Sequence, residues 1–271
     1  MERTALITGC SSGIGRATAA AYLAEDWTVY ATARDVADLG DLADAGAVTR
    51  ELDVTKPAQV EAVVDDVAGE AGRIDVLVNN AGYGQFGPLE DVPTRDVHRQ
   101  FDANVYGPHR LIRVALPHMR EAEDGTIVTV SSLAARVPTP GMGVYAGSKA
   151  AIEAMSDALR SEVARFGIDV VLVEPGPVET DFRERAREEL ADLPQGTAYE
   201  ALYETYEDYR RVSGVAAVSP EAVASVILEA GVSTDPDPRY GVGPVARYAG
   251  LARLVPDRLR DAILSLVARL P

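Results

Sequence analysis

The chain has 271 residues, of which 47% are hydrophobic and 25% are charged; these fractions are typical of a globular protein and exclude a disordered or fibrous one. Its 42 Asp and Glu outnumber 26 Lys and Arg, which gives a formal net charge of -16. Such a surface repels nucleic acid and anionic membranes, because phosphate binding needs clustered basic residues. We therefore expect neither a nucleic-acid partner nor membrane association.

The acidity also bears on where the protein works. An acid-rich surface with only Lys56 and Lys149 as lysines suits a salt-rich cytoplasm, where screening removes the repulsion between acids. We favour this halophilic interpretation over its alternative, a GC-rich codon usage. No secretory signal precedes the first apolar stretch, and no apolar run reaches the roughly 18 residues of a spanning helix. The expected location is the cytoplasm.

Short β-branched runs alternate with longer helical patterns from the N-terminus onward. This alternation is typical of repeated strand–helix–strand units, which build a parallel sheet with helices on both faces. The predicted fold is a single doubly wound Rossmann-type α/β domain over residues 1–271. The predicted strands are residues 4–8, 28–33, 47–52, 74–79, 126–130, 168–173 and 240–242.

The helical patterns fill the intervals between these strands. One helix begins after Gly15 and carries small residues that allow close approach to the sheet. A long helix over residues 94–120 should bend or end near Pro108 and Pro117, because proline removes a helix hydrogen bond and clashes with the preceding turn. A third helix covers residues 145–166, and a fourth begins at residues 219–221.

The strand pattern stops over residues 176–219, a stretch rich in Glu, Arg and Tyr. An excursion of this length in a compact domain is usually functional, so we assign it to a substrate lid. Its tyrosines at 199, 203, 206 and 209 either line a substrate pocket or, as we favour for most of them, pack the lid onto the domain. Residues 247–271 form a C-terminal amphipathic tail whose role is open between an interface and a membrane surface.

A glycine-rich turn, Thr8-Gly9-Cys10-Ser11-Ser12-Gly13-Ile14-Gly15, follows the first predicted strand. Glycines let backbone N–H groups approach a pyrophosphate, and the next helix presents the positive end of its dipole to that anion. Alone, such a turn is a weak signal, and a purely structural turn is its competitor. Its place between the first strand and the first helix favours a bound dinucleotide.

Five further motifs follow this turn in the order and spacing of one family. With them the chain resembles the short-chain dehydrogenase/reductase family up to about Thr180, and the steroid- and retinoid-type members more than the sugar reductases. The resemblance implies a nicotinamide dinucleotide cofactor and a homo-oligomer built through the two long helices. The motifs are Asn79-Asn80-Ala81-Gly82, Asn104-Val105-Tyr106-Gly107, Ser131-Ser132, Tyr145-Ala146-Gly147-Ser148-Lys149 and Pro175-Gly176-Pro177-Val178-Glu179-Thr180.

Tyr145 and Lys149 lie four residues apart on a predicted helix, which sets their side chains on one face. Hydride transfer to a ketone leaves a developing alkoxide that needs a proton donor, and an ammonium group nearby lowers the pKa of a phenol from about 10. For an isolated Tyr-x-x-x-Lys a surface pair is the favoured alternative; the other motifs reverse that preference.

The resemblance gives each catalytic residue a role. It implies Tyr145 as acid/base, Lys149 as its activator and ribose ligand, and Ser132 as the group that stabilises the substrate oxygen. It also implies that Asn104 orders a helix backbone and a water that links Lys149 to solvent. Ser132 is chosen over Ser131 because it stands thirteen residues before Tyr145; Ser131 is expected to pack or hydrogen-bond at the strand end.

Cofactor choice depends on the end of the second strand, where an NAD-selecting enzyme of this fold carries an acid. This chain has Ala33 followed by Arg34, and Asp35 should point away. Because guanidinium suits a 2′-phosphate, NADP(H) is the preferred cofactor and NAD(H) the alternative. Asp53 is the expected adenine contact and a cap for the helix at Pro57. The cofactor residues are Gly9, Ser11, Ser12, Gly13, Ile14, Gly15, Arg34, Asp53, Val54, Asn80, Ala81, Gly82, Tyr145, Lys149, Pro175, Gly176, Val178 and Thr180.

The expected function is NADP(H)-dependent interconversion of a secondary alcohol and a ketone, with a hydrophobic small-molecule substrate. The alternatives are a 3-oxoacyl or polyol reductase of the same family and a catalytically silent dinucleotide-sensing protein. No metal site is expected, because His98, His109 and His118 lie outside any carboxylate-rich cluster.

Overall fold

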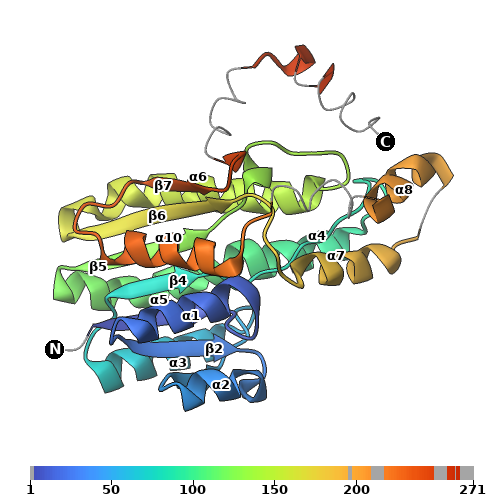
Figure 1. The fold of residues 1–271 in the computed structure, drawn as a ribbon. Helices are drawn as coiled ribbons and strands as arrows, with labels where there is room; N and C mark the ends of the chain where they lie inside the picture. Colours follow the sequence, from blue (N-terminus) through green and yellow to red (C-terminus); the bar gives the residue numbers. More distant parts are fainter. Residues whose placement is uncertain (1–2, 195–196, 209–216, 247–254, 260, 263–271) are drawn as a thin grey trace.

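The computed structural model describes residues 3–194, 197–208, 217–246, 255–259 and 261–262, and its centre is a seven-stranded sheet (Figure 1). All pairs of neighbouring strands are parallel, in the order β3-β2-β1-β4-β5-β6-β7. The strands are β1 Thr4–Thr8, β2 Thr28–Ala33, β3 Val48–Glu51, β4 Val76–Asn79, β5 Gly125–Val130, β6 Ile168–Pro175 and β7 Arg239–Val242. This confirms the predicted doubly wound Rossmann-type fold.

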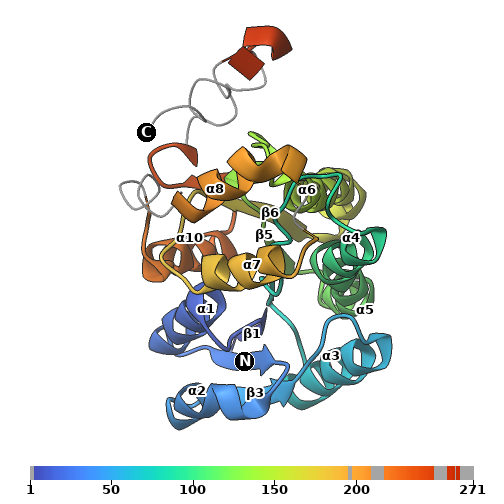
Figure 2. The same ribbon diagram turned by 90° about the vertical axis from the view of Figure 1, so that its right-hand side faces the viewer.

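Helices cover both faces of the sheet. Figure 2 shows α1 and α10 on one side and α3, α5 and α6 on the other. The helices are α1 Gly13–Ala24, α2 Gly40–Asp44, α3 Pro57–Ala71, α4 Thr94–Phe101, α5 Gly107–Ala122, α6 Gly143–Val163, α7 Phe182–Ala191, α8 Glu200–Asp208 and α10 Pro220–Val232. The predicted helix over 145–166 thus begins at Gly143 and ends at Val163, and a tighter turn covers Ala164–Phe166.

Each strand buries alternate side chains in two separate apolar layers. In β1, Ile7 packs into the layer of α1 and α10, whereas Leu6 packs into the layer of α3 and α5. Val128 and Ile127 of β5 divide in the same way. A parallel strand covered on both faces has no polar side, which is why these runs are continuously apolar in the sequence. Only the strand ends at the carboxyl edge are free to carry chemistry.

The long helix expected over 94–120 is two helices. A wider π-helical turn, Asp102–Tyr106, joins α4 to α5 directly before Pro108. The regular α-helix is thus interrupted near Pro108, as expected, whereas a helix end at Pro117 is wrong, because this proline lies inside α5 and the helix continues to Ala122. Ala115 and Met119, on either side of Pro117, are buried against the sheet and hold that part of the helix in place.

Helices α7 and α8, from the stretch predicted as a lid, lie across the carboxyl end of the sheet (Figure 2). Tyr199 donates a hydrogen bond to Glu90 (2.6 Å), and Tyr203 donates one to Asp91 (2.7 Å). The favoured packing role is therefore confirmed for these two tyrosines, and neither lines the cleft described below. The side chain of Tyr206, all of Tyr209 and most of the predicted tail at 247–271 lie outside the described residues.

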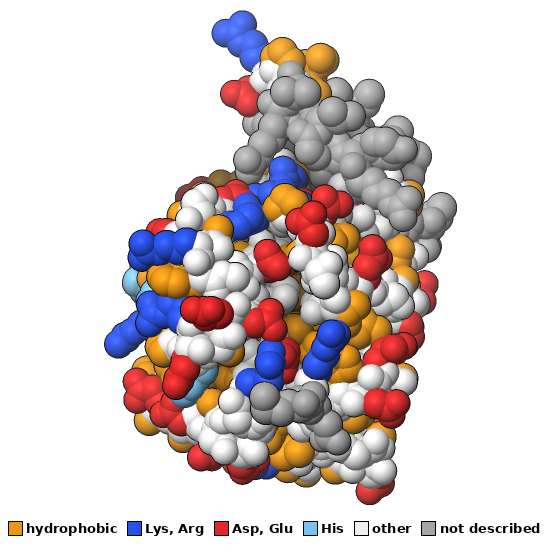
Figure 3. Space-filling model, turned by 90° about the vertical axis from the view of Figure 1, so that its left-hand side faces the viewer, with side chains coloured by type: hydrophobic (Ala, Val, Ile, Leu, Met, Phe, Trp, Pro, Cys, Tyr) orange, Lys and Arg blue, Asp and Glu red, His pale blue; other side chains and the backbone are white. Residues whose placement is uncertain are grey.

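The charged surface carries both signs. On the face shown in Figure 3, acidic and basic side chains are interspersed over white and orange surface. Within the described ranges, no helix combines the length and the apolar character needed to cross a membrane. The described residues likewise contain no group of three or more His, Cys, Asp and Glu side chains arranged to hold a metal ion.

The contact between α1 and α10 depends on Gly231. A Cβ atom at this position would lie 2.0 Å from the hydroxyl of the fully buried Tyr22. We expect Gly231→Ala to lower the free energy of unfolding by about 2 kcal/mol, because overpacking outweighs the gain in helix propensity. Gly69 of α3 is the matched control, since a Cβ atom there meets no atom within 4 Å; Gly69→Ala should raise the stability by up to ~1 kcal/mol. Urea unfolding of both variants checks this, and equal stability of the two would contradict the assigned contact.

Candidate active site

The site begins where the strand order of the sheet changes direction, between β1 and β4. The Thr8 hydroxyl accepts hydrogen bonds from the N–H groups of Asn80 (3.0 Å) and Ala81 (3.1 Å). The Asn80 amide donates to the carbonyls of Thr8 (2.8 Å) and Gly9 (3.2 Å). These bonds fix the glycine turn beside the Asn-Asn-Ala-Gly turn, at the position where open α/β sheets bind ligands.

A single cleft of about 790 Å³ runs along this edge of the sheet. It falls within the usual range of ligand pockets. Of the predicted site residues only Gly15 and Asn104 do not line it. The predicted residues that line it are Gly9, Ser11, Ser12, Gly13, Ile14, Arg34, Asp53, Val54, Asn80, Ala81, Gly82, Ser132, Tyr145, Lys149, Pro175, Gly176, Val178 and Thr180.

Gly15 has a different task from the one predicted. A Cβ atom at Gly15 would lie 2.2 Å from the Gly9 carbonyl oxygen, so this glycine lets the start of α1 pack against the turn instead of lining the cleft. Gly9 and Gly13 have positive φ angles of 74° and 55°, which favour glycine. A Cβ atom at Gly13 would lie 2.9 Å from Thr180 Cγ2. The turn is therefore packed on both sides.

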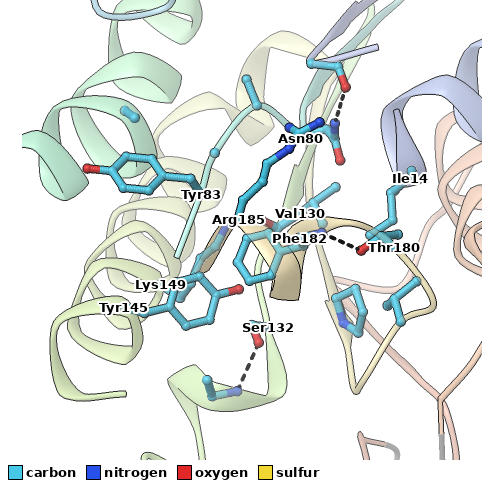
Figure 4. A pocket seen from close by; sticks show the side chains of 18 of the residues that line it. Ile14, Asn80, Tyr83, Val130, Ser132, Tyr145, Lys149, Thr180, Phe182 and Arg185 are labelled. Carbon is cyan, nitrogen blue, oxygen red and sulfur yellow. Dashed lines mark hydrogen bonds between the residues drawn. The ribbon is translucent and has the colours of Figure 1, made fainter. Parts of the chain in front are cut away.

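Tyr145 stands at the other end of the cleft, on the first turn of α6. Its ring packs against Phe182 (5.5 Å between centroids) and Phe86 (5.9 Å), and its phenol oxygen points toward Ser132 (Figure 4). Burial raises the pKa of Tyr145 to about 12, although the hydrogen bond with Ser132 acts in the opposite direction. The phenol is therefore protonated at neutral pH.

Lys149 is also buried, one helical turn further along α6. Its ammonium group donates to the Val130 carbonyl (2.8 Å) and lies 6.0 Å from the centre of the Tyr145 ring. Desolvation lowers the pKa of Lys149 to about 8, although the charge of Glu153 raises it. In this structure the ammonium faces the strand end and burial dominates at the phenol, so the lowering of the tyrosine pKa by Lys149 together with an oxidised nicotinamide stays a prediction.

Asn104 lies in the π-helical turn beneath the cleft and is 1% exposed. Its side chain accepts from the Tyr83 N–H (3.1 Å) and donates to the Tyr83 carbonyl (3.0 Å) and the Ser148 hydroxyl (3.2 Å). Ser148 in turn donates to the Tyr145 carbonyl (2.7 Å). Asn104 thus connects the loop after β4 to the helix that carries Tyr145 and Lys149.

A buried ionic network supports the other side of α6. Ser131 donates to Glu153 (2.7 Å), which confirms its expected hydrogen bond at the strand end. Arg239 of β7 pairs with Glu153 (3.0 Å) and with Glu174 of β6, and Arg136 pairs with Glu174 (2.7 Å). Because both glutamates are nearly fully buried, these partners are needed to offset their desolvation. The network ties the end of β5 to α6, β6 and β7.

The opposite end of the cleft matches an adenosine site. Ala33 and Arg34 line it, and Asp35 does not; its carboxylate instead accepts from the Ala37 N–H (2.9 Å), as predicted for a residue that points away. Asp53 accepts from the Thr55 N–H and hydroxyl. Burial acts to raise its pKa, but these hydrogen bonds together with the charges of Lys56 and Arg34 lower it. Its predicted role as a helix cap is wrong by position, because Lys56 stands directly before α3.

Several lining residues were not predicted. Phe86, Met142 and Phe182 form the apolar surroundings of Tyr145, and Arg185 of α7 reaches the glycine turn. No spacing rule connects them, because they come from three different segments. The one signal in the sequence was the placement of residues 182 and 185 at the start of the suspected lid.

The cleft fits a dinucleotide on these observations. One end has the glycine turn and the start of α1, the other has the buried Tyr145 and Lys149, and Arg34 lies beside Asp53 at the adenosine end. The donors are backbone N–H groups, hydroxyls and guanidinium, which is the set that phosphate and ribose require.

Comparison with known proteins decides the family. The family model described as short chain dehydrogenase matches residues 3–191. The chain belongs to the short-chain dehydrogenase family, and it is an oxidoreductase of that family. A solved short-chain dehydrogenase from Streptomyces avermitilis has a TM-score of 0.83 and 34% sequence identity, over 98% of this chain and 96% of the other.

The curated relatives of this dehydrogenase include oxidoreductases of different kinds. The uncharacterized oxidoreductase YbbO of Escherichia coli is 36% identical over 97% of this chain and 94% of its own. The NADPH-dependent 3-dehydrocapnine reductase of Ornithobacterium rhinotracheale is 31% identical over 96% and 95%. The human 17-beta-hydroxysteroid dehydrogenase type 1 is 36% identical over 89% of this chain and 77% of its own, in line with the predicted likeness to steroid-type members.

Burial of the charged Lys149 should lower the free energy of unfolding, because the ammonium loses its hydration. Because its pKa is about 8 in the folded protein and 10.5 for an ordinary lysine, the unfolded chain binds the extra proton between these pH values, and the stability of the wild type rises with pH there. We expect Lys149→Met to raise the free energy of unfolding by about 2 kcal/mol at pH 7, after allowing for the lost bond to Val130.

Denaturant unfolding of this variant from pH 7 to pH 10.5 checks the sign, since the gain should shrink above pH 8. The matched control is Lys56→Met, which changes the chain's other lysine at an exposed position and should give no gain at any of these pH values. A gain that stays constant up to pH 10.5 would show that the charge of Lys149 is not what destabilises the fold.

Proposed function

We propose that this dehydrogenase is an NADP(H)-preferring oxidoreductase that interconverts a secondary alcohol and a ketone on a hydrophobic substrate. The observation that carries the proposal is the composition of one cleft. Its Tyr145, Ser132 and Lys149 lie at an apolar end, and its glycine turn lies at the other. A ketone held beside the phenol would thus lie within the same cleft as a dinucleotide held by the turn.

Tyr145 is the proposed proton donor in ketone reduction. Because burial keeps its phenol protonated at neutral pH, it donates a proton to the alkoxide that develops on the substrate. Ser132 holds the substrate oxygen by a hydrogen bond, as its hydroxyl already faces the phenol. The nicotinamide cofactor, when bound, supplies or accepts the hydride. In the alcohol-oxidation direction Tyr145 takes the proton back.

Lys149 and Asn104 support this transfer. The Lys149 ammonium, with a pKa lowered to about 8 by desolvation, changes its charge near working pH, and it is proposed to bind the ribose and to stabilise a phenolate during turnover. Asn104 is proposed to act as a positioning residue, because its contacts run through Tyr83 and Ser148 and not to the cleft itself.

The substrate end favours a hydrophobic compound. Leu133, Val137 and Met142 line the cleft together with Phe86 and Phe182, and a polyol or another small hydrophilic ketone would leave its hydroxyls without partners on such a wall. The relative named as a 17-beta-hydroxysteroid dehydrogenase supports a hydrophobic substrate, and the relative named as NADPH-dependent supports the proposed cofactor. We propose that residues 176–219 close over this end as a lid, since Phe182 comes from α7. A homo-oligomer and a cytoplasmic location remain part of the proposal.

Tyr145→Phe should abolish turnover, with a loss of at least about a thousandfold in kcat, because it removes the proton donor and one hydroxyl only. The affinity for NADPH should change by less than about threefold. Steady-state kinetics over a panel of bulky apolar ketones, with cofactor binding followed by fluorescence, checks both values. Retention of most of the activity would remove Tyr145 from the mechanism.

The preference for NADPH should depend on the last residue of β2 and the residue that follows it. Ala33 removes the repulsion of an acid at that position, and Arg34 lines the cleft beside it. Ala33→Asp combined with Arg34→Ala should raise the KM for NADPH by about tenfold or more and move the preference toward NADH, because a charge-assisted contact is replaced by a repulsion. Comparable kcat/KM values for NADPH and NADH in the wild type would contradict the role of Arg34.

A further inference from the structure

Arg185, on the first turn of α7, points its guanidinium into the cleft (Figure 4). It donates a hydrogen bond to the Ser12 hydroxyl (3.2 Å) across 173 positions of sequence. Ser12 stands directly before α1 and makes no capping bond with its side chain. Arg185 therefore reaches the residue that begins the helix of the glycine turn.

The charges around Arg185 are of both signs, because α7 also carries Glu184, Glu188 and Glu189. Arg185 lies near the N-termini of two helices, its own α7 and, through Ser12, α1, and both ends carry positive partial charge. Within the described part of the chain no carboxylate lies within 4.0 Å of its guanidinium; Glu189, one turn further on α7, pairs with Arg99 instead (3.4 Å). The exposed guanidinium is therefore available to an anion that lies between the two helix ends.

The start of α7 is held against the glycine turn at a second point. The N–H of Phe182 donates to the Thr180 hydroxyl (3.4 Å), and Thr180 contacts the position of Gly13 so closely that a Cβ atom there would lie 2.9 Å away. An anion at the turn would thus meet Arg185 without a large movement of the chain. Phe182, three residues before Arg185, packs on Tyr145.

We propose that Arg185 binds the pyrophosphate of the dinucleotide and that this contact fixes α7 over the Tyr145 end of the cleft. The inference rests on the dinucleotide cofactor of the proposed function. It adds a positioning residue that works through the anion: the same helical turn that carries Arg185 carries Phe182, so cofactor binding orders the wall beside the substrate. Arg34 is assigned to the 2′-phosphate, so the two arginines bind different phosphates of NADPH.

Direct binding separates these two assignments. The probes are ADP-ribose and NADH, which carry the pyrophosphate alone, and NADPH, which carries the 2′-phosphate as well; dissociation constants are measured by isothermal titration calorimetry. Arg185→Gln should weaken all three by a similar factor of about 10, because one charge-assisted contact is lost. Arg34→Gln should weaken NADPH alone. Arg185→Lys should recover part of the loss, since a point charge replaces the planar group.

Arg113→Gln is the charge-matched control, because Arg113 is exposed on α5 and does not line the cleft. It should leave all three dissociation constants within about twofold. Unchanged binding of ADP-ribose to Arg185→Gln would overturn the proposal, and so would a loss confined to NADPH, which would assign Arg185 to the 2′-phosphate. Equal melting temperatures of the variants without ligand exclude a folding effect.

Hydrogen exchange tests the coupling to α7. Addition of ADP-ribose should slow exchange of the amides over residues 182–191 at least about threefold in the wild type and not in Arg185→Gln compared at equal saturation. Exchange that slows equally in both proteins would overturn the coupling. These readouts need no turnover, so a failure to reduce any ketone would refute the proposed reaction and leave the pyrophosphate contact standing.

Discussion

Thr8 and Asn80 join the ends of β1 and β4, at the point where the strand order of the sheet changes direction. The ladder between these strands ends at the pair Ile7 and Val78, and beyond it the two strands no longer pair with each other. The Thr8 hydroxyl replaces the ladder, because it donates to the Val78 carbonyl (3.1 Å) and accepts two N–H groups from the following turn. Buried backbone groups have to be paired, so the fold and the site have this junction in common.

A path of hydrogen bonds leads from this junction to α6, the helix that carries Tyr145 and Lys149. The turn that Asn80 begins continues to Tyr83, whose backbone is bound on both sides by Asn104. Asn104 is aimed at this backbone because the π-helical turn inserts it between α4 and α5, and Ser148 carries the path on to Tyr145. A Cβ atom at Gly82 would lie 2.8 Å from the Asn104 side chain. The spacing between the glycine turn and Tyr145 is therefore set by directed bonds and not by packing alone.

The sequence predicted the parts of the site that local rules determine. Strand and helix periods located the carboxyl edge of the sheet, and Tyr145 and Lys149 share a helix face by their spacing. Prediction from the sequence failed for features of the site that depend on contacts between distant segments. The burial that raises the pKa of Tyr145 includes contacts with Phe86 and Phe182, which reach it from the loop after β4 and from α7. The π-helical turn that carries Asn104 follows no propensity rule that the sequence displays.

The lid shows the same division between local and long-range information. Helical spacing of its tyrosines was visible in the sequence, but whether Tyr199 faces the cleft or the domain depends on Glu90, which lies 109 positions away. Gly15 is a similar case. Only glycine fits at this position, because the start of α1 packs against the carbonyl of Gly9 in the same turn. A motif locates such residues without stating what they touch.

A chain with a net charge of -16 is an unfavourable long-range partner for an anionic cofactor, and the cleft resolves this locally. In physiological salt the Debye length is about 8 Å, so the many surface acids act weakly on a phosphate inside the cleft. Charged groups in direct contact with the phosphate are screened much less by salt. The start of α1 and the side chains of Arg34 and Arg185 are such groups. A nucleic acid would need a continuous basic surface. The proposed pyrophosphate contact needs only a helix end and Arg185, which pairs with no carboxylate among the described residues.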